Sequence, residues 1–253
     1  MRLYCRHCEV CCRVHREKAP KQGLLLSFVA GAPWDGIHID LTGRHPRSRR
    51  GNQYILTVVD AFTKFALGIT IREKSGHCVA RALTEEVFAM YGMPLFIISD
   101  LGREFKNQTM CEICRLIDVH KLRTTSYKPS TNGMVERFHQ TLNSALEKVV
   151  NESQREWCER LPFILAAHET AYRASEHSST GFSPHFLTFG REVRAPVDLV
   201  LGEPEHGKTS TDYYVVELKE CLRSAYHLVR DQLGRTAERA KKYYDVRVHK
   251  KSF

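Results

Sequence analysis

The chain has 253 residues, of which 42% are apolar and 26% charged, and its 38 lysines and arginines against 29 acidic residues give a formal net charge of +9. This composition is typical of a folded globular protein and excludes wholesale disorder. The longest apolar stretch, residues 23–34, is shorter than a membrane span of roughly 18 residues. Four cysteines precede it, which is untypical of a secretory signal, so we expect neither.

The excess of basic charge lies at the two ends of the chain. Residues 1–22 carry a net charge of +4 and residues 219–253 a net charge of +6, so the residues between them are close to neutral. This pattern indicates either contact with a polyanion through the flanks or two solvated, partly helical tails. A separate basic cluster lies inside the neutral body and consists of Arg44, Arg47, Arg49 and Arg50.

The first part of the chain predicts three strands and a helix. Residues 37–41 alternate between apolar and polar side chains, and residues 54–59 and 65–71 are two further β-rich runs with short connections. Such closely spaced strands favour antiparallel pairing. Ser75 is a helix N-cap candidate, and the helix that it begins would run to about residue 91, before Gly92 and Pro94.

The second part predicts one buried strand and mainly helices. Residues 95–99 are wholly apolar, as in a central strand covered on both faces. A turn-rich loop at 127–133 leads into a long helix with an apolar stripe. The remaining predictions are a helix at 107–117, a strand at 119–124, the long helix at 133–151 and helices at 155–175 and 212–244. This order predicts an α/β fold, a mixed sheet with helices on both faces.

Three acidic residues lie where a purely structural role is hard to justify. Asp40 ends the first strand, Asp100 ends the central strand, and Glu136 lies in the first turn of the long helix, 35 residues after Asp100. If the first strand pairs with the central one, the two aspartates emerge side by side. Converging carboxylates repel unless a cation neutralises them, and Mg²⁺ or Mn²⁺ is the cation that suits oxygen ligands. Two such ions would suit phosphodiester chemistry.

The alternative is that Asp40 and Asp100 cap strand ends and that Glu136 favours a helix N-terminus. Asp60 is a further acid near these strands, and we interpret it as a turn residue. The nine cysteines are an odd number without a secretory signal, so we interpret them as reduced thiols. Cys111 and Cys114 form a CxxC pair that we interpret as buried core thiols on one helix.

Several segments together resemble the integrase catalytic core of gypsy-type LTR retrotransposons and, more distantly, of retroviruses, a part of the Pol polyprotein. The matching segments are PWDGIHIDLTG (33–43), GNQYILTVVDAFTKF (51–65), YGMPLFIISDLGREF (91–105), TTSYKPSTNGMVERFHQTL (124–142) and HSSTGFSPHFLTFGREVRAPVDL (177–199). The resemblance implies a ribonuclease H-like fold, a mixed five-stranded sheet flanked by helices. It also implies a D,D-35-E site in which Asp40, Asp100 and Glu136 are catalytic and bind two Mg²⁺ or Mn²⁺ ions.

The resemblance also implies DNA contacts around the long helix. These would come from the loop before Glu136 and from the helix face that Glu136 shares, and the alternative is a solvated polar face. The residues concerned are Tyr127, Lys128, Asn132, Gly133, Arg137, His139, Gln140 and Asn143.

The N-terminal segment resembles the end of the family's HHCC zinc module. Cys8 and Cys11 would be its paired thiolates, but zinc takes four ligands, so we expect Zn²⁺ only if the missing upstream histidines are supplied. The expected domains are a remnant of the zinc module at 1–22, the catalytic core at 34–200 and a basic helical extension at 201–253.

The implied activity is an endonuclease and strand-transferase reaction that processes the 3′ ends of retroelement DNA and integrates them into target DNA. The implied partners are double-stranded DNA and further copies of the chain, with no membrane. We expect integration in the nucleus, particle assembly in the cytoplasm and no secretion. The alternatives are a catalytically inactive, element-derived nucleic-acid-binding protein and a stand-alone nuclease that hydrolyses DNA but never joins it.

Overall fold

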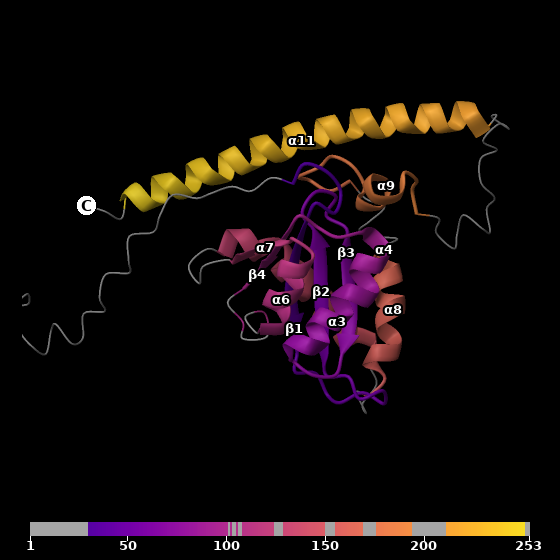
Figure 1. The fold of residues 1–253 in the computed structure, drawn as a ribbon, viewed down its shortest axis with the longest axis vertical. Coiled ribbons are helices and arrows are strands. Elements are labelled where there is room, and N and C mark those ends of the chain that lie inside the picture. The colour runs from indigo at the N-terminus through magenta and orange to yellow at the C-terminus, as the bar shows by residue number, and fades with distance from the viewer. Residues whose placement is uncertain are drawn as a thin grey trace, which may run out of the picture. The chain divides into compact units, whose positions relative to one another are not determined.

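A computed structural model describes residues 30–100, 102, 105, 108–123, 129–149, 155–168, 176–193 and 211–250 of the chain (Figure 1). Residues 29–234 form one compact unit, and residues 235–253 belong with 1–28 to a second. The strands are β1 (Gly36–Thr42), β2 (Tyr54–Asp60), β3 (Ala66–Ile71), β4 (Phe96–Ser99) and β5 (His120–Arg123). The helices are α3 (Gly76–Ala82), the π-helical η1 (Leu83–Phe88), α4 (Ala89–Tyr91), α6 (Gln108–Leu116), α7 (Pro129–Val149), α8 (Trp157–His168), α9 (Pro184–Phe189) and α11 (Thr211–Lys250).

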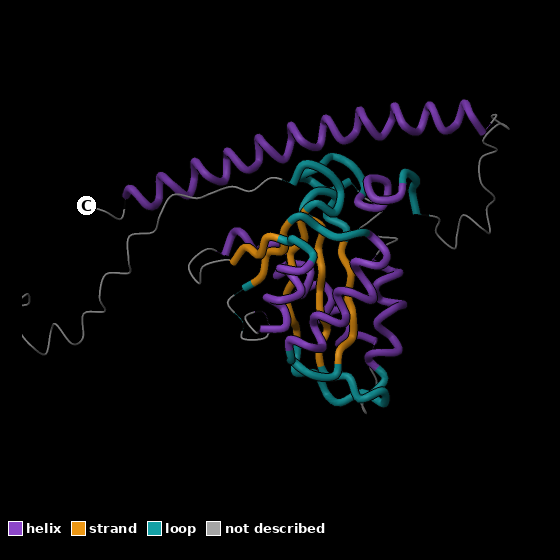
Figure 2. Tube along the Cα trace, viewed as in Figure 1, coloured by secondary structure: helices purple, strands orange, loops and turns teal. Residues whose placement is uncertain are grey.

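The five strands form one mixed sheet in the order β3-β2-β1-β4-β5 (Figure 2). β1, β2 and β3 pair antiparallel, as the short connections predict, whereas β4 pairs parallel with both β1 and β5. The predicted neighbourhood of the first and the central strand is therefore confirmed. Because β1, β3, β4 and β5 run in the same direction, their carboxyl ends lie at one edge of the sheet.

Two apolar layers cover the two faces of the sheet. Ile37 and Ile39 of β1 pack with the α3–η1 helix and with α6 on one face. Ile55 and Val59 of β2 pack with α7 and α8 on the other. Successive side chains of a strand point to opposite faces of the sheet. The side chains that alternate with Ile37 and Ile39 on β1, among them Asp40, therefore point toward α7.

The first half of α11 belongs to the same unit as the sheet. Ala225, Val229 and Leu233 are spaced four residues apart, so they share one helix face, and they pack against Phe62 and Leu187. Tyr226 Oη donates a hydrogen bond to the Leu187 carbonyl at 3.0 Å. The compact unit thus includes the first half of α11.

Helix boundaries differ from the predictions at three places. The helix capped by Ser75, whose Oγ accepts from Cys78 N at 3.3 Å, contains the π-helical segment η1. α7 begins at Pro129 rather than at 133, and proline suits a first helical position because its φ is fixed and it lacks an N–H. α9 was not predicted, although Ser183 caps it and Gly190 ends it in the left-handed conformation.

Two interpretations of single residue types have different outcomes. The five described cysteines are free thiols, as interpreted, but Cys111 is exposed and only Cys114 is buried. The prediction that both are core thiols is therefore half wrong. Among the described residues, no helix is long and apolar enough to cross a membrane.

Candidate active site at the carboxyl ends of β1 and β4

Asp40 and Asp100 follow one another across two neighbouring strands. In the parallel pair, Ile39 of β1 lies opposite Ser99 of β4. Asp40 and Asp100 are the residues that directly follow this last pair, one in each strand's direction. We call this part of the sheet the carboxylate edge. Asp40 lies within β1, which continues to Thr42, rather than at its end as predicted.

The same register gives the two aspartates a common face. Ile37 and Ile97 are opposite each other and belong to the same core cluster, on the face covered by α3. Paired residues of a sheet direct their side chains to the same side, and the direction reverses at each residue. Three residues further on, Asp40 and Asp100 therefore occupy positions of the opposite face, on which α7 packs.

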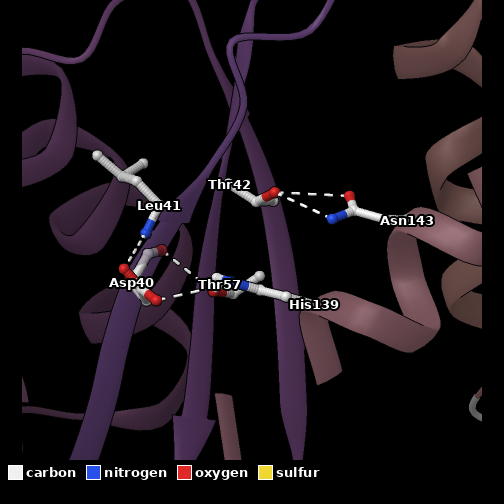
Figure 3. Close-up of polar contacts among 6 residues, drawn as sticks. All are labelled: Asp40, Leu41, Thr42, Thr57, His139 and Asn143. Carbon is white, nitrogen blue, oxygen red and sulfur yellow. Dashed lines mark hydrogen bonds and ion pairs between the residues drawn. The ribbon is translucent and has the colours of Figure 1, made fainter. Parts of the chain in front are cut away.

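The Asp40 side chain is held by two groups (Figure 3). Its Oδ1 accepts a hydrogen bond from the Leu41 N–H at 2.8 Å, and its Oδ2 lies 3.7 Å from Nδ1 of His139. The Asp40 side chain is 20% exposed and that of His139 is 14% exposed. The carboxylate is thus partly sheltered by α7 but still open to solvent.

Thr57 of β2 links Asp40 to α7. Its hydroxyl donates to the backbone carbonyl of Asp40 at 3.1 Å and lies 2.5 Å from Nε2 of His139 (Figure 3). Since a hydroxyl has one proton and donates it to Asp40, it accepts from His139, whose Nε2 then carries the ring proton. This tautomer leaves the lone pair of Nδ1 facing the Asp40 carboxylate.

The His139 ring is neutral at ordinary pH. Burial and, to a smaller extent, the nearby charge of His45 together lower its pKa from 6.5 to about 4. Burial also lowers the pKa of His45. His139 therefore supports Asp40 by packing and indirectly, through its hydrogen bond to the Thr57 hydroxyl, rather than by a full positive charge.

A second polar contact holds α7 to β1. Asn143, one turn after His139, lies within 3.5 Å of the hydroxyl of Thr42, with both its oxygen and its nitrogen close to Oγ1 (Figure 3). His139 and Asn143 thus follow β1 along the same helix face. Glu136 precedes His139 by three residues, about 4.5 Å along the helix axis, and shares that face.

The third predicted acid is located only through its helix. Glu136 lies in α7, while its side chain is outside the described part of the chain. Among the described side chains, no group of three histidine, cysteine or acidic residues forms a metal site. The convergence of Asp40, Asp100 and Glu136 therefore remains a prediction, of which the register of Asp40 and Asp100 is the described part.

Asp100 begins the loop after β4. Its Oδ1 accepts a hydrogen bond from the Gly102 N–H at 2.8 Å, which turns the chain away from the sheet. The side chain is half-buried. This turn holds the carboxylate at the strand end instead of letting it swing freely.

Asp60 has the structural role that we expected. It is fully buried, and its carboxylate accepts hydrogen bonds from Trp34 N, Phe62 N and both N and Oγ1 of Thr63. Burial raises its pKa, and these hydrogen bonds oppose that shift. Asp60 pairs with Ile37, three residues before Asp40 on β1, so it braces the β2–β3 turn at the other end of the sheet.

Residues 31–129 of the chain match the family model described as "Integrase core domain". This stretch of the chain is thus similar to integrase core domains. The chain is 29% identical over 215 residues to the retrovirus-related Pol polyprotein from transposon 412 of Drosophila melanogaster. This alignment covers 85% of the chain and 17% of that polyprotein. It is 27% identical over 206 residues to gypsy retrotransposon integrase-like protein 1 of Bos taurus, with 81% of this chain and 39% of that protein covered. The chain thus spans well under half the length of these relatives.

One solved structure shares the fold. A chain of the simian T-cell lymphotropic virus intasome, determined in complex with PP2A regulatory subunit B56 gamma, superposes with a TM-score of 0.52 at 17% identity, covering 81% of this chain and 68% of that one. The resemblance to retroelement integrases and the ribonuclease H-like fold are both confirmed. The mixed five-stranded sheet with its flanking helices is that fold.

The DNA contacts predicted for the integrase core have different outcomes. Asn132 and Gly133 lie in α7 and not in a loop, because the helix already begins at Pro129. His139 faces the sheet, and Asn143 contacts Thr42, so neither belongs to the solvated polar face that was the alternative to DNA contact. Gln140 is exposed. The described part of the chain does not include Tyr127, Lys128, Cys8 and Cys11. It includes Arg137 as a residue of α7 but not its side chain.

Sequence reasoning missed Thr57 and Thr42. Both hydroxyls lie on the α7 face of the sheet and contact the helix. The signal that could have found them is the alternation of β2, where Thr57 interrupts the apolar residues Ile55 and Val59 that face α7. A buried threonine at such a position needs a hydrogen-bond partner.

Proposed function

We propose that this chain is the catalytic core of an integrase-type polynucleotidyl transferase, which processes the 3′ ends of retroelement DNA and joins them to target DNA in the nucleus. The observation that carries the proposal is the carboxylate edge. Asp40 and Asp100 directly follow the last paired residues of two parallel strands, within the stretch that matches the integrase core domain. Catalytic groups of α/β sheets gather at such carboxyl ends.

The donor set at this edge fits a hard divalent cation. Two carboxylates on adjacent strands repel, and a neutral His139 adds little positive charge to offset them. Asp40, Asp100 and Glu136 would hold Mg²⁺ or Mn²⁺, which prefer oxygen ligands. When bound, such ions activate the attacking oxygen and stabilise the leaving oxygen of an in-line phosphoryl displacement.

The protein's own groups would keep the Asp40 carboxylate in one orientation. The Leu41 N–H fixes Oδ1, and Thr57 couples the Asp40 backbone to the His139 ring. In the first reaction, water would attack near the 3′ end of the element DNA and free a 3′-hydroxyl. That hydroxyl would then attack a phosphodiester of target DNA, so both reactions use one orientation of the site and no covalent enzyme intermediate.

The partners follow from these two reactions. Two DNA ends must reach a target together, so we infer that the chain works as a homo-multimer. Gln140 is an exposed side chain one residue after His139, in the middle of α7, and in this proposal it is available to DNA. The contacts by Tyr127, Lys128, Asn132, Gly133 and Arg137 remain predictions.

A strand-transfer assay with Mn²⁺, element-end oligonucleotides and a target duplex tests the proposal. We expect joined product from the chain and a loss of at least about 100-fold with Asp100→Asn, which corresponds to about 2.7 kcal/mol in the barrier. Asp118→Asn is the matched control, because it makes the same change in the turn after α6, away from the carboxylate edge. It should join DNA at the original rate.

Two other outcomes would overturn the proposal. Tight DNA binding with no product, unaffected by Asp100→Asn, would assign the chain to the inactive, element-derived binding proteins. Cleavage that never yields joined strands would assign it to the stand-alone nucleases. The integrase, the inactive binding protein and the stand-alone nuclease are all tested with the same oligonucleotides, so one set of reactions separates these three functions.

A further inference from the structure

The loop that follows β1 lies next to the carboxylate edge. It comprises residues 43–53, and we call it the basic loop (Figure 2). Asp40 is two residues before the end of β1, so the loop leaves the sheet at the same end as the carboxylates. β3 also ends there, since Gln53 N donates to the Ile71 carbonyl at 3.1 Å, and Arg72 follows directly.

The basic loop is fixed by hydrogen bonds to two neighbouring segments, the start of α8 and β3. Trp157 Nε1 donates to the Pro46 carbonyl at 2.7 Å, and Arg49 N donates to the Arg155 carbonyl at 3.0 Å. Asn52 Nδ2 donates to Thr70 Oγ1 at 3.0 Å. The His45 ring packs on Trp157, with 5.1 Å between the ring centroids. The loop therefore presents its side chains from a rigid frame.

The arginines of the basic loop are not equivalent. Arg49 forms an ion pair with Glu156 at 2.8 Å. Arg44, Arg47 and Arg50 are exposed, and none of them forms an ion pair with any residue that the structure describes. Arg49 thus stabilises the fold through its ion pair, whereas the other three arginines of the loop present their positive charges to solvent.

Two guanidinium groups converge above Gly51. A Cβ atom added to this glycine would lie 4.0 Å from Nε and Nη2 of Arg47 and 4.0 Å from Nε of Arg72. The two guanidinium groups are therefore no more than twice that distance apart, although they repel each other. No carboxylate of the described residues pairs with either one.

We propose that the basic loop together with Arg72 is a docking surface for the phosphate backbone of duplex DNA beside the carboxylate edge. Guanidinium groups bind phosphate oxygens in a bidentate manner, and a phosphate between Arg47 and Arg72 removes their mutual repulsion. Arg44 is four residues after Asp40, so their Cα atoms are at most about 14 Å apart. That length corresponds to about four nucleotide rises along one strand.

The proposal rests on the proposed function for its choice of DNA, and it adds the path of the strand. A duplex whose scissile phosphate lies at Asp40 would run over the end of β1 and place phosphates a few nucleotides away on the basic loop. The loop then fixes the register of the DNA without reading its bases. The residues between the two basic ends have a net charge close to zero, but under this proposal their basic loop still contacts DNA phosphates.

The test measures the salt dependence of DNA binding by the full 253-residue chain without metal. A fluorescent 20-base-pair duplex is titrated between 50 and 200 mM salt against the unchanged chain and three variants. The first variant is the double change Arg47→Gln and Arg72→Gln. The second is Arg49→Gln, which removes the same type of charge from the same loop but from an arginine already paired with Glu156. The third is Arg47→Lys with Arg72→Lys.

The double glutamine variant should lose two phosphate contacts. Its slope of log affinity against log salt should therefore be smaller in magnitude by about 1.8, which makes the affinity ratio between the two salt concentrations about tenfold smaller. Arg49→Gln should keep the original slope, and the lysine variant should regain most of it. An unchanged slope in the double variant, or an equal loss in Arg49→Gln, would overturn the proposal.

This test is independent of the test of function. A chain that joins DNA while the double variant keeps its slope has the proposed function but no docking surface at the basic loop. A chain that joins nothing while the slope changes as expected has the docking surface and lacks the proposed function. The binding assay contains no metal, so it does not depend on the metal site.

Discussion

Replacing Thr57 by valine removes the one hydroxyl that joins Asp40 to α7 while nearly preserving the shape of the side chain. Thr57 is fully buried, with 0% of its surface exposed. The change deletes the hydrogen bond to the Asp40 carbonyl and leaves Nε2 of His139 without its partner. An unsatisfied buried polar group costs about 1–3 kcal/mol. We therefore expect the free energy of unfolding to fall by about 2 kcal/mol.

The matched control is Thr57→Ser, which keeps the hydroxyl and loses only a methyl group. Its expected cost is about 0.8 kcal/mol. Urea unfolding at pH 7, followed by circular dichroism, gives the free energy of unfolding for both variants. A valine variant at least as stable as the serine variant would refute the hydrogen-bond assignment among Thr57, Asp40 and His139.

The same pair of variants separates positioning from stability. If Thr57 orients Asp40, strand transfer should slow about tenfold in the valine variant, a loss of about 1.4 kcal/mol in the transition state, at a temperature where both variants are folded. The serine variant should retain the original rate. Equal rates in the two variants, together with the expected difference in stability, would reduce Thr57 to a structural residue.

Two further predictions concern the helices that pack on the sheet. His139 has a pKa of about 4 in the folded chain against 6.5 unfolded, so the unfolded state binds more protons between these values and stability falls as the pH drops. His139 alone should lower the free energy of unfolding by about 2 kcal/mol between pH 7 and pH 5. In urea unfolding, His139→Asn should remove that part of the pH dependence. If the variant shows the same difference in stability between the two pH values as the unchanged chain, the ring is not buried and neutral. Val229→Ala in α11 should cost about 2 kcal/mol because the side chain is fully buried, whereas Leu228→Ala, at a 55% exposed position next to it, should cost less than about 0.5 kcal/mol in the same measurement.

The sheet was predictable because its signals are local and periodic. The alternation of β1, the apolar run of β4 and the short connections around β2 determine strand type and pairing direction with little help from distant residues. The N-terminus of α7 was not predictable in this way. Asn132 and Gly133 have low helix propensity, and only Pro129 at the first helical position indicates that the helix has already begun.

In the candidate site, too, one feature was predictable from local sequence signals and another was not. The adjacency of Asp40 and Asp100 follows from one assumption, the pairing of two strands, which the structure bears out. The orientation of His139 required more, since it depends on the rotation of α7 set by Val135, Phe138 and Leu142 in the apolar layer. A polar residue on an amphipathic helix is expected to face solvent, and His139 instead finds a hydroxyl on the sheet.

The carboxylate edge and the basic loop are two consequences of the course of β1. The strand extends beyond its partner β4, which ends opposite Ile39, and so carries the chain past Asp40 into the loop before β2. A protein that binds a polyanion at clustered carboxylates faces repulsion between substrate and site. The basic loop that follows β1 holds three arginines without an ion pair to any described residue, and these offset that repulsion without neutralising the carboxylates, because the two charges would lie on different parts of the bound DNA strand. The placement of opposite charges at one edge is therefore what a phosphodiester substrate requires.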